Sequence, residues 1–126
     1  MIKEFREYND SLLELAQITS KTDFFYQKYG KIVIKGGGDN NAGTKEHNPS
    51  HFHLEFNDGN EIRIIIPANI DDDLISLDDT LNGKIIKDLR KWFILPYKFA
   101  DRYNNYEMLK IQWNTLNYGD DNVTKL

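Results

Sequence analysis

Cysteine is absent from this chain of 126 residues, and proline occurs only three times. Without cysteine the protein has no disulfide, no thiolate metal site and no cysteine redox chemistry. No run of about 18 apolar residues occurs, so we expect no membrane-spanning helix. The N-terminus carries charges of both signs and lacks the apolar core of a signal peptide. We therefore expect a cytoplasmic protein.

Size and composition favour a single domain. The chain is short for two domains, and its hydrophobic share of 40% allows a buried core. Apolar residues recur at helical spacing over residues 2–19, which predicts a helix in an N-terminal extension over residues 1–20. We expect one α+β domain over residues 21–118 and a frayed tail over residues 119–126.

Two short segments on either side of a turn predict a β-hairpin. Residues 50–56 and 60–66 are rich in β-branched and aromatic residues, and Asn57-Asp58-Gly59 separates them. A three-residue loop that ends in glycine suits a type I turn followed by a left-handed bulge residue. Residues 31–35 and 74–77 predict two further short strands.

The length of that loop fixes the register of the hairpin. The expected pairs are Phe56 with Asn60, Glu55 with Glu61, Leu54 with Ile62, His53 with Arg63, Phe52 with Ile64 and His51 with Ile65. Side chains alternate between the two faces of a strand, so the apolar residues share one face. We expect that face to be core: Phe52, Leu54, Ile62 and Ile64. The opposite face carries His51, His53, Glu55 and Arg63.

The C-terminal third predicts two helices. One begins near Gly83, and Pro96 interrupts it because proline lacks the amide hydrogen that continues a helix. Pro96 also suits the first turn of a second helix. That helix shows apolar residues at three- and four-residue steps: Phe99, Tyr103, Tyr106, Leu109, Trp113 and Leu116. The expected fold class is α+β, a small antiparallel sheet packed on two C-terminal helices with an additional N-terminal helix.

All three histidines lie in one seven-residue window, His47-Asn48-Pro49-Ser50-His51-Phe52-His53. The window resembles the H-x-P-P-H-F-H signature of the small prokaryotic domain of unknown function 4160 family, with Ser50 in place of the second proline. The order of the flanking elements agrees over about residues 24–117. Members of that family are small bacterial proteins, often encoded beside another small domain. The resemblance therefore implies a toxin–antitoxin-like or defence-related setting.

The histidines predict a metal site in one interpretation. His51 and His53 are two residues apart on the expected strand, so both imidazoles project from the same face. They can chelate a divalent metal ion such as zinc, nickel or manganese, with His47 or Glu55 as a further ligand. In the alternative interpretation the face is structural, and His53 pairs with a neighbouring carboxylate.

The same face also carries groups that RNA cleavage requires. His51 or His53 can remove the proton of a 2′-hydroxyl group, and a second acid can protonate the leaving oxygen. Arg63 can stabilise the charge that develops on the phosphate. Histidine suits both steps because its unperturbed pKa is about 6.5. The structural alternative is that Arg63 is a cross-strand partner of His53 or Glu55.

A local excess of positive charge stands within a protein of net charge −4. Residues 83–102 hold six Lys and Arg against two Asp. Lys84, Lys87 and Lys91 follow helical spacing and, with Arg90, can contact the phosphates of a nucleic acid. The alternative is an ordinary solvated helix face. The glycine-rich loop 36–43 lacks the phosphate-loop sequence, although its amides can form an anion-binding nest.

Three hypotheses for function follow. The first is a small bacterial or mobile-element protein of a toxin–antitoxin-like or defence-related system that acts on RNA through the histidines. The second is a noncatalytic binding module whose N-terminal helix or basic helix docks a small partner protein encoded nearby. The third is a divalent-metal-binding domain that uses His47, His51 and His53. Substrate, partner and oligomeric state stay open.

Overall fold

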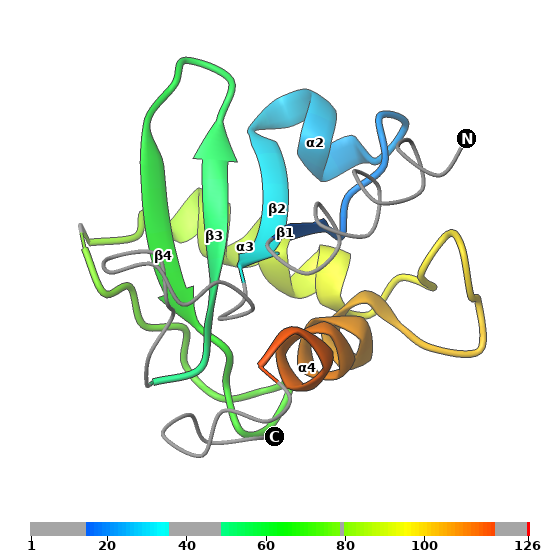
Figure 1. Ribbon diagram of the computed structural model, residues 1–126. Helices are drawn as coiled ribbons and strands as arrows, with labels where there is room; N and C mark the ends of the chain where they lie inside the picture. Colours follow the sequence, from blue (N-terminus) through cyan, green and yellow to red (C-terminus); the bar gives the residue numbers. More distant parts are fainter. Residues whose placement is uncertain (1–14, 36–48, 79, 118–125) are drawn as a thin grey trace, which may run out of the picture.

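The computed structural model describes residues 15–35, 49–78, 80–117 and 126 (Figure 1). Within these residues four antiparallel strands form one sheet in chain order. The strands are β1 (Leu15–Gln17), β2 (Gly30–Lys35), β3 (His51–Phe56) and β4 (Glu61–Ile65). The described helices are α2 (Phe24–Lys28), α3 (Gly83–Phe93) and α4 (Asn105–Leu116). The α+β fold class and the two C-terminal helices are confirmed.

The helices pack against the sheet and enclose a hydrophobic core together with it. In Figure 1, α3 lies behind the sheet, and α4 crosses near the end at which β3 begins. The expected apolar face of the hairpin is the core, with Phe52, Leu54, Ile62 and Ile64 all buried. Both tryptophans, Trp92 of α3 and Trp113 of α4, are fully buried. None of the described helices is long and apolar enough to cross a membrane.

The hairpin of β3 and β4 has the predicted register. The paired residues are His51 with Ile65, Phe52 with Ile64, His53 with Arg63, Leu54 with Ile62 and Glu55 with Glu61. Gly59 has a φ of 95°, the left-handed conformation that the predicted turn requires. The segment expected as a strand over residues 74–77 instead reaches β4 through an isolated bridge between Ile64 and Ser76.

The prediction of an N-terminal helix over residues 2–19 is wrong for its last residues. Leu15–Gln17 form β1, which pairs with β2. The next residue, Ile18, donates its N–H to the Ile32 carbonyl at 2.8 Å and is buried. Without β1, the main-chain N–H and C=O groups along one edge of β2 would have no hydrogen-bond partner in the sheet. Pairing of β1 with β2 satisfies these groups, and this gain outweighs the helical spacing of the apolar residues. The sheet therefore begins before residue 20, and the rest of the expectation, over residues 2–14, lies outside the described residues.

The second C-terminal helix begins at Asn105 and not at Pro96. The Asn104 side chain accepts the Glu107 N–H at 2.7 Å, and the Glu107 side chain accepts the Asn104 N–H at 2.9 Å. This capping box fixes the start of α4. Pro96 and Asn104 form a bridge that closes the preceding loop. Phe99, expected on the helix, lies in this loop and is 73% exposed.

The expected tail over residues 119–126 lies outside the described residues except for Leu126. The main chain of Leu126 exchanges hydrogen bonds with the Asn114 side chain, at 2.8 and 2.7 Å. This last residue is therefore held against α4.

Candidate functional site

The histidine face of the sheet has the expected composition but is buried. The ring centroids of His51 and His53 lie 5.1 Å apart, so β3 does bring the two imidazoles together. His51 is 1% exposed and His53 is 6% exposed. The ring of Trp113 lies 5.3 Å from that of His51, so α4 covers part of this face. Both imidazoles are therefore shielded from solvent, and their catalytic role stays a prediction.

Both histidines make close polar contacts. Nδ1 of His51 lies 2.7 Å from the main-chain oxygen of Pro49, and Nδ1 of His53 lies 2.5 Å from Oε1 of Glu61. Lys35 also donates to this oxygen, at 3.0 Å. Burial raises the pKa of the Glu61 carboxyl, but the hydrogen bonds from Lys35 and His53 outweigh this and hold the pKa below its ordinary value. Glu61 therefore stays ionised beside His53.

Arg63 points toward a loop carboxylate. Its Nη2 and Nε lie 2.9 and 3.3 Å from Asp78, and its main-chain N–H donates to the same carboxylate at 2.7 Å. These hydrogen bonds hold the pKa of the Asp78 carboxyl below its usual range. Arg63 thus has Asp78 as a partner, which the hairpin pattern did not indicate.

The predicted metal site stays a prediction. His47 lies outside the described residues. Across the described parts of the chain, no group of three or more His, Asp or Glu side chains could hold a metal ion. Glu55, the expected carboxylate ligand, instead lies 3.8 Å from the ammonium group of Lys35.

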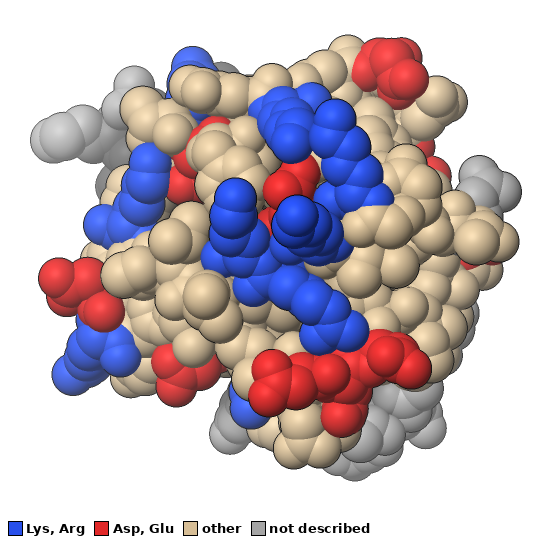
Figure 2. All heavy atoms as spheres, turned by 180° about the vertical axis from the view of Figure 1, so that it is seen from behind, with Lys and Arg blue, Asp and Glu red and all other residues tan. Residues whose placement is uncertain are grey.

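The predicted basic face of α3 is exposed. We call Lys84, Lys87 and Lys91 the lysine stripe, and all three are exposed to solvent. Figure 2 views the molecule from behind and shows Lys and Arg gathering in the middle of this face, with the largest group of acidic side chains below them. Arg90 is directed elsewhere, because its Nη2 donates to the Asp72 carbonyl at 3.1 Å.

One buried carboxylate lies beneath the lysines. Asp88 accepts hydrogen bonds from Lys28 at 2.7 Å and from the Tyr29 hydroxyl at 2.6 Å, which fastens α2 to α3. These two bonds hold the pKa of the Asp88 carboxyl below its ordinary value. The ion pair of Lys28 and Asp88 therefore lies beside the lysine stripe and adds no net charge to it. The sequence did not indicate it, because residues 24–29 fit neither a helix nor a strand pattern clearly.

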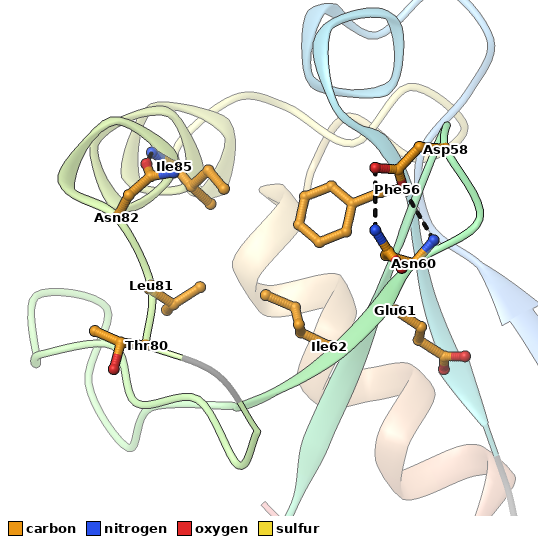
Figure 3. A pocket seen from close by; sticks show the side chains of 9 residues that line it. All are labelled: Phe56, Asp58, Asn60, Glu61, Ile62, Thr80, Leu81, Asn82 and Ile85. Carbon is orange, nitrogen blue, oxygen red and sulfur yellow. Dashed lines mark hydrogen bonds between the residues drawn. The ribbon is translucent and has the colours of Figure 1, made fainter.

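A pocket of about 480 Å³ lies between the β3–β4 hairpin and the start of α3 (Figure 3). Four apolar side chains point toward one another around it: Phe56, Ile62, Leu81 and Ile85. Asp58 and Asn60 lie on the hairpin side, whereas Thr80 and Asn82 lie on the α3 side. The hairpin and α3 are far apart in sequence, so no local pattern predicts this pocket.

Comparisons of the chain with protein-family models, with curated proteins and with solved structures find no match. The resemblance of residues 47–53 to the domain of unknown function 4160 family therefore stays a prediction. The histidine face, the basic face of α3 and the pocket are therefore the features from which a function can be proposed.

Proposed function

We propose that this protein is a nucleic-acid-binding module that holds RNA by its phosphates on the exposed face of α3. The observation that carries the proposal is the lysine stripe, which lies on one helical face of a protein of net charge −4. Within the described residues Lys84, Lys87 and Lys91 have no ion pair to a carboxylate. The same holds for Lys21, Lys31, Arg102 and Lys110, but only the three lysines of the stripe share one helical face.

The residue type favours a nucleic acid over a protein partner. Lysine is depleted in protein–protein interfaces, where arginine and aromatic residues predominate. A flexible ammonium group can follow a phosphate backbone, and its binding gains free energy from the release of condensed counterions. Three lysines spaced over two helical turns thus fit a polyanion better than the shaped surface of a folded partner.

The histidine face has a structural role in this proposal. His51 and His53 are buried, and His53 contacts Glu61. Placing the RNA on α3 requires no opening of that face. A toxin–antitoxin-like or defence-related system is the setting we propose, and it depends on the resemblance in the histidine window.

The test is the salt dependence of RNA binding. A variant with alanine at Lys84, Lys87 and Lys91 should bind a fluorescent RNA about 10- to 100-fold more weakly at low salt. It should also lose about 2 units from the slope of log affinity against log salt, since each phosphate contact on a single strand contributes about 0.7. The matched control removes three other lysines, Lys21, Lys31 and Lys110, so that the net charge is equal. An equal loss in both variants would contradict the proposal.

A further inference from the structure

The pocket of Figure 3 and the lysine stripe both include a residue from the first turn of α3. Ile85 lines the pocket, and Lys84 precedes it in the chain. An α-helix turns by about 100° per residue, so the exposed Lys84 side chain leaves the first turn of α3 on a different side from the buried Ile85. Lys91 lies about 10 Å further along the axis. A strand that leaves the pocket across the first turn of α3 therefore reaches the first lysine of the stripe.

We infer that this pocket receives an unpaired nucleobase from a single strand whose phosphates lie on the lysine stripe. The inference rests on the proposed function and names its ligand class. The ring of Phe56 offers a face on which a base can stack, and Ile62, Leu81 and Ile85 complete an apolar slot. The volume of about 480 Å³ falls within the range of about 300–1,000 Å³ typical of ligand pockets.

The rim supplies both kinds of hydrogen-bonding group that the edge of a base needs. Asn82 accepts the Ile85 N–H at 2.8 Å through Oδ1, which leaves its Nδ2 as a donor. Asn60 donates through Nδ2 to Asp58 at 3.1 Å, which leaves its Oδ1 as an acceptor. Base edges present donors and acceptors side by side, so amide groups suit them.

The charges around the pocket orient the strand. The Glu61 carboxylate points away from the pocket in Figure 3 and is held by Lys35 and His53. Asp58 places a negative charge on the hairpin side, where it repels phosphate. The lysine stripe lies on the other side, along α3. The backbone of the strand therefore follows α3, and the base enters the pocket from there.

The experiment fills the pocket and compares two forms of one RNA. We would measure the binding of a single strand of about 12 nucleotides, and of the same sequence in a duplex, to the full chain. The wild type should prefer the single strand about tenfold, because stacking of one base on an aromatic side chain is worth about 1–3 kcal/mol. Leu81→Trp should fill the slot and abolish that preference while leaving the salt slope unchanged.

Two further variants keep the outcome clear. Phe56→Leu keeps an apolar side chain but removes the stacking ring, and it should lower single-strand affinity about fivefold or more. Ile75→Trp adds the same bulk at an exposed position outside the pocket and should change nothing. Equal affinity for both RNA forms, unaffected by Leu81→Trp and Phe56→Leu, would overturn the inference and leave the proposed function standing. Absence of binding to either RNA would overturn both.

An acidic protein surface is the rival occupant, and a poly-glutamate peptide is its probe. The inference requires that the peptide bind more weakly than the single strand and that Leu81→Trp leave its binding unchanged. Tighter binding of the peptide, lost in Leu81→Trp, would assign the pocket to a protein partner instead.

Discussion

The histidine face of the sheet and the exposed face of α3 both carry ionisable side chains, but only the first buries them. On the sheet, His53 and Glu61 form a close pair, and Trp113 packs against His51. On α3 the lysine stripe faces solvent, with no ion pair to the described residues. The difference is one of access, because the two imidazoles are shielded from solvent whereas the lysines of the stripe are exposed to it.

The largest effect should follow from removing the cover of the histidine face. Trp113→Ala removes a fully buried indole and should lower the free energy of unfolding by about 3–5 kcal/mol, because the cavity cannot collapse completely. Urea denaturation measures this change. Thr115→Ala, at an exposed position on the same helix, should stay within about 0.5 kcal/mol of the wild type. A small loss for Trp113→Ala would mean that α4 covers the histidines only loosely.

The next largest effect should come from the histidine that contacts Glu61. His53→Ala should lower the free energy of unfolding by about 1–3 kcal/mol, since a buried hydrogen-bonded side chain is lost. Combining it with Glu61→Ala should show a coupling energy of about 0.5 kcal/mol or more in a double-mutant cycle. An RNA-cleaving activity that vanishes in a fully stable His53→Ala variant would contradict the structural role and restore the catalytic hypothesis.

Local sequence patterns were sufficient to predict the hairpin and the start of α3. The loop that ends at Gly59 and the alternation of apolar residues leave one register that buries Phe52 and Leu54 together. The start of α4 was mispredicted because Phe99 continues a helical spacing. The sequence did hold the decisive signal, since Asn104 and Glu107 stand at capping-box spacing.

Long-range contacts explain what the sequence did not predict. A strand of three residues, such as β1, is too short to distinguish a period of two from a helical period. The burial of His51 depends on Trp113, which comes much later in the chain. The lysine stripe was predicted because it lies within one helix. The pocket was not, because its walls come from both the hairpin and α3.

A pH-dependent effect should distinguish the buried carboxylate of α3 from the lysines above it. The pKa of Asp88 is lowered in the folded protein by Lys28 and Tyr29, so its stabilising effect is present above the unfolded pKa and is lost as the pH falls through the folded pKa. Asp88→Asn should therefore be less stable than the wild type near pH 7, and this difference should shrink below about pH 4. Chemical denaturation at several pH values measures it. A difference that is constant with pH would contradict the assigned ion pair.

The smallest effect on stability should come from the lysine stripe itself. Lys84→Ala and Lys87→Ala should each change the free energy of unfolding by less than about 0.5 kcal/mol, because both side chains are exposed and unpaired within the described residues. Each should nevertheless remove about 0.7 from the salt slope of single-strand RNA binding. His53→Ala should show the reverse. Its stability should be lower, and its salt slope should be unchanged when binding is measured under conditions in which the variant is folded. A marked loss of stability in Lys84→Ala with no change in the salt slope would mean that the lysine stripe, like the histidine face, has a structural role. The contrast between the two regions would then be wrong.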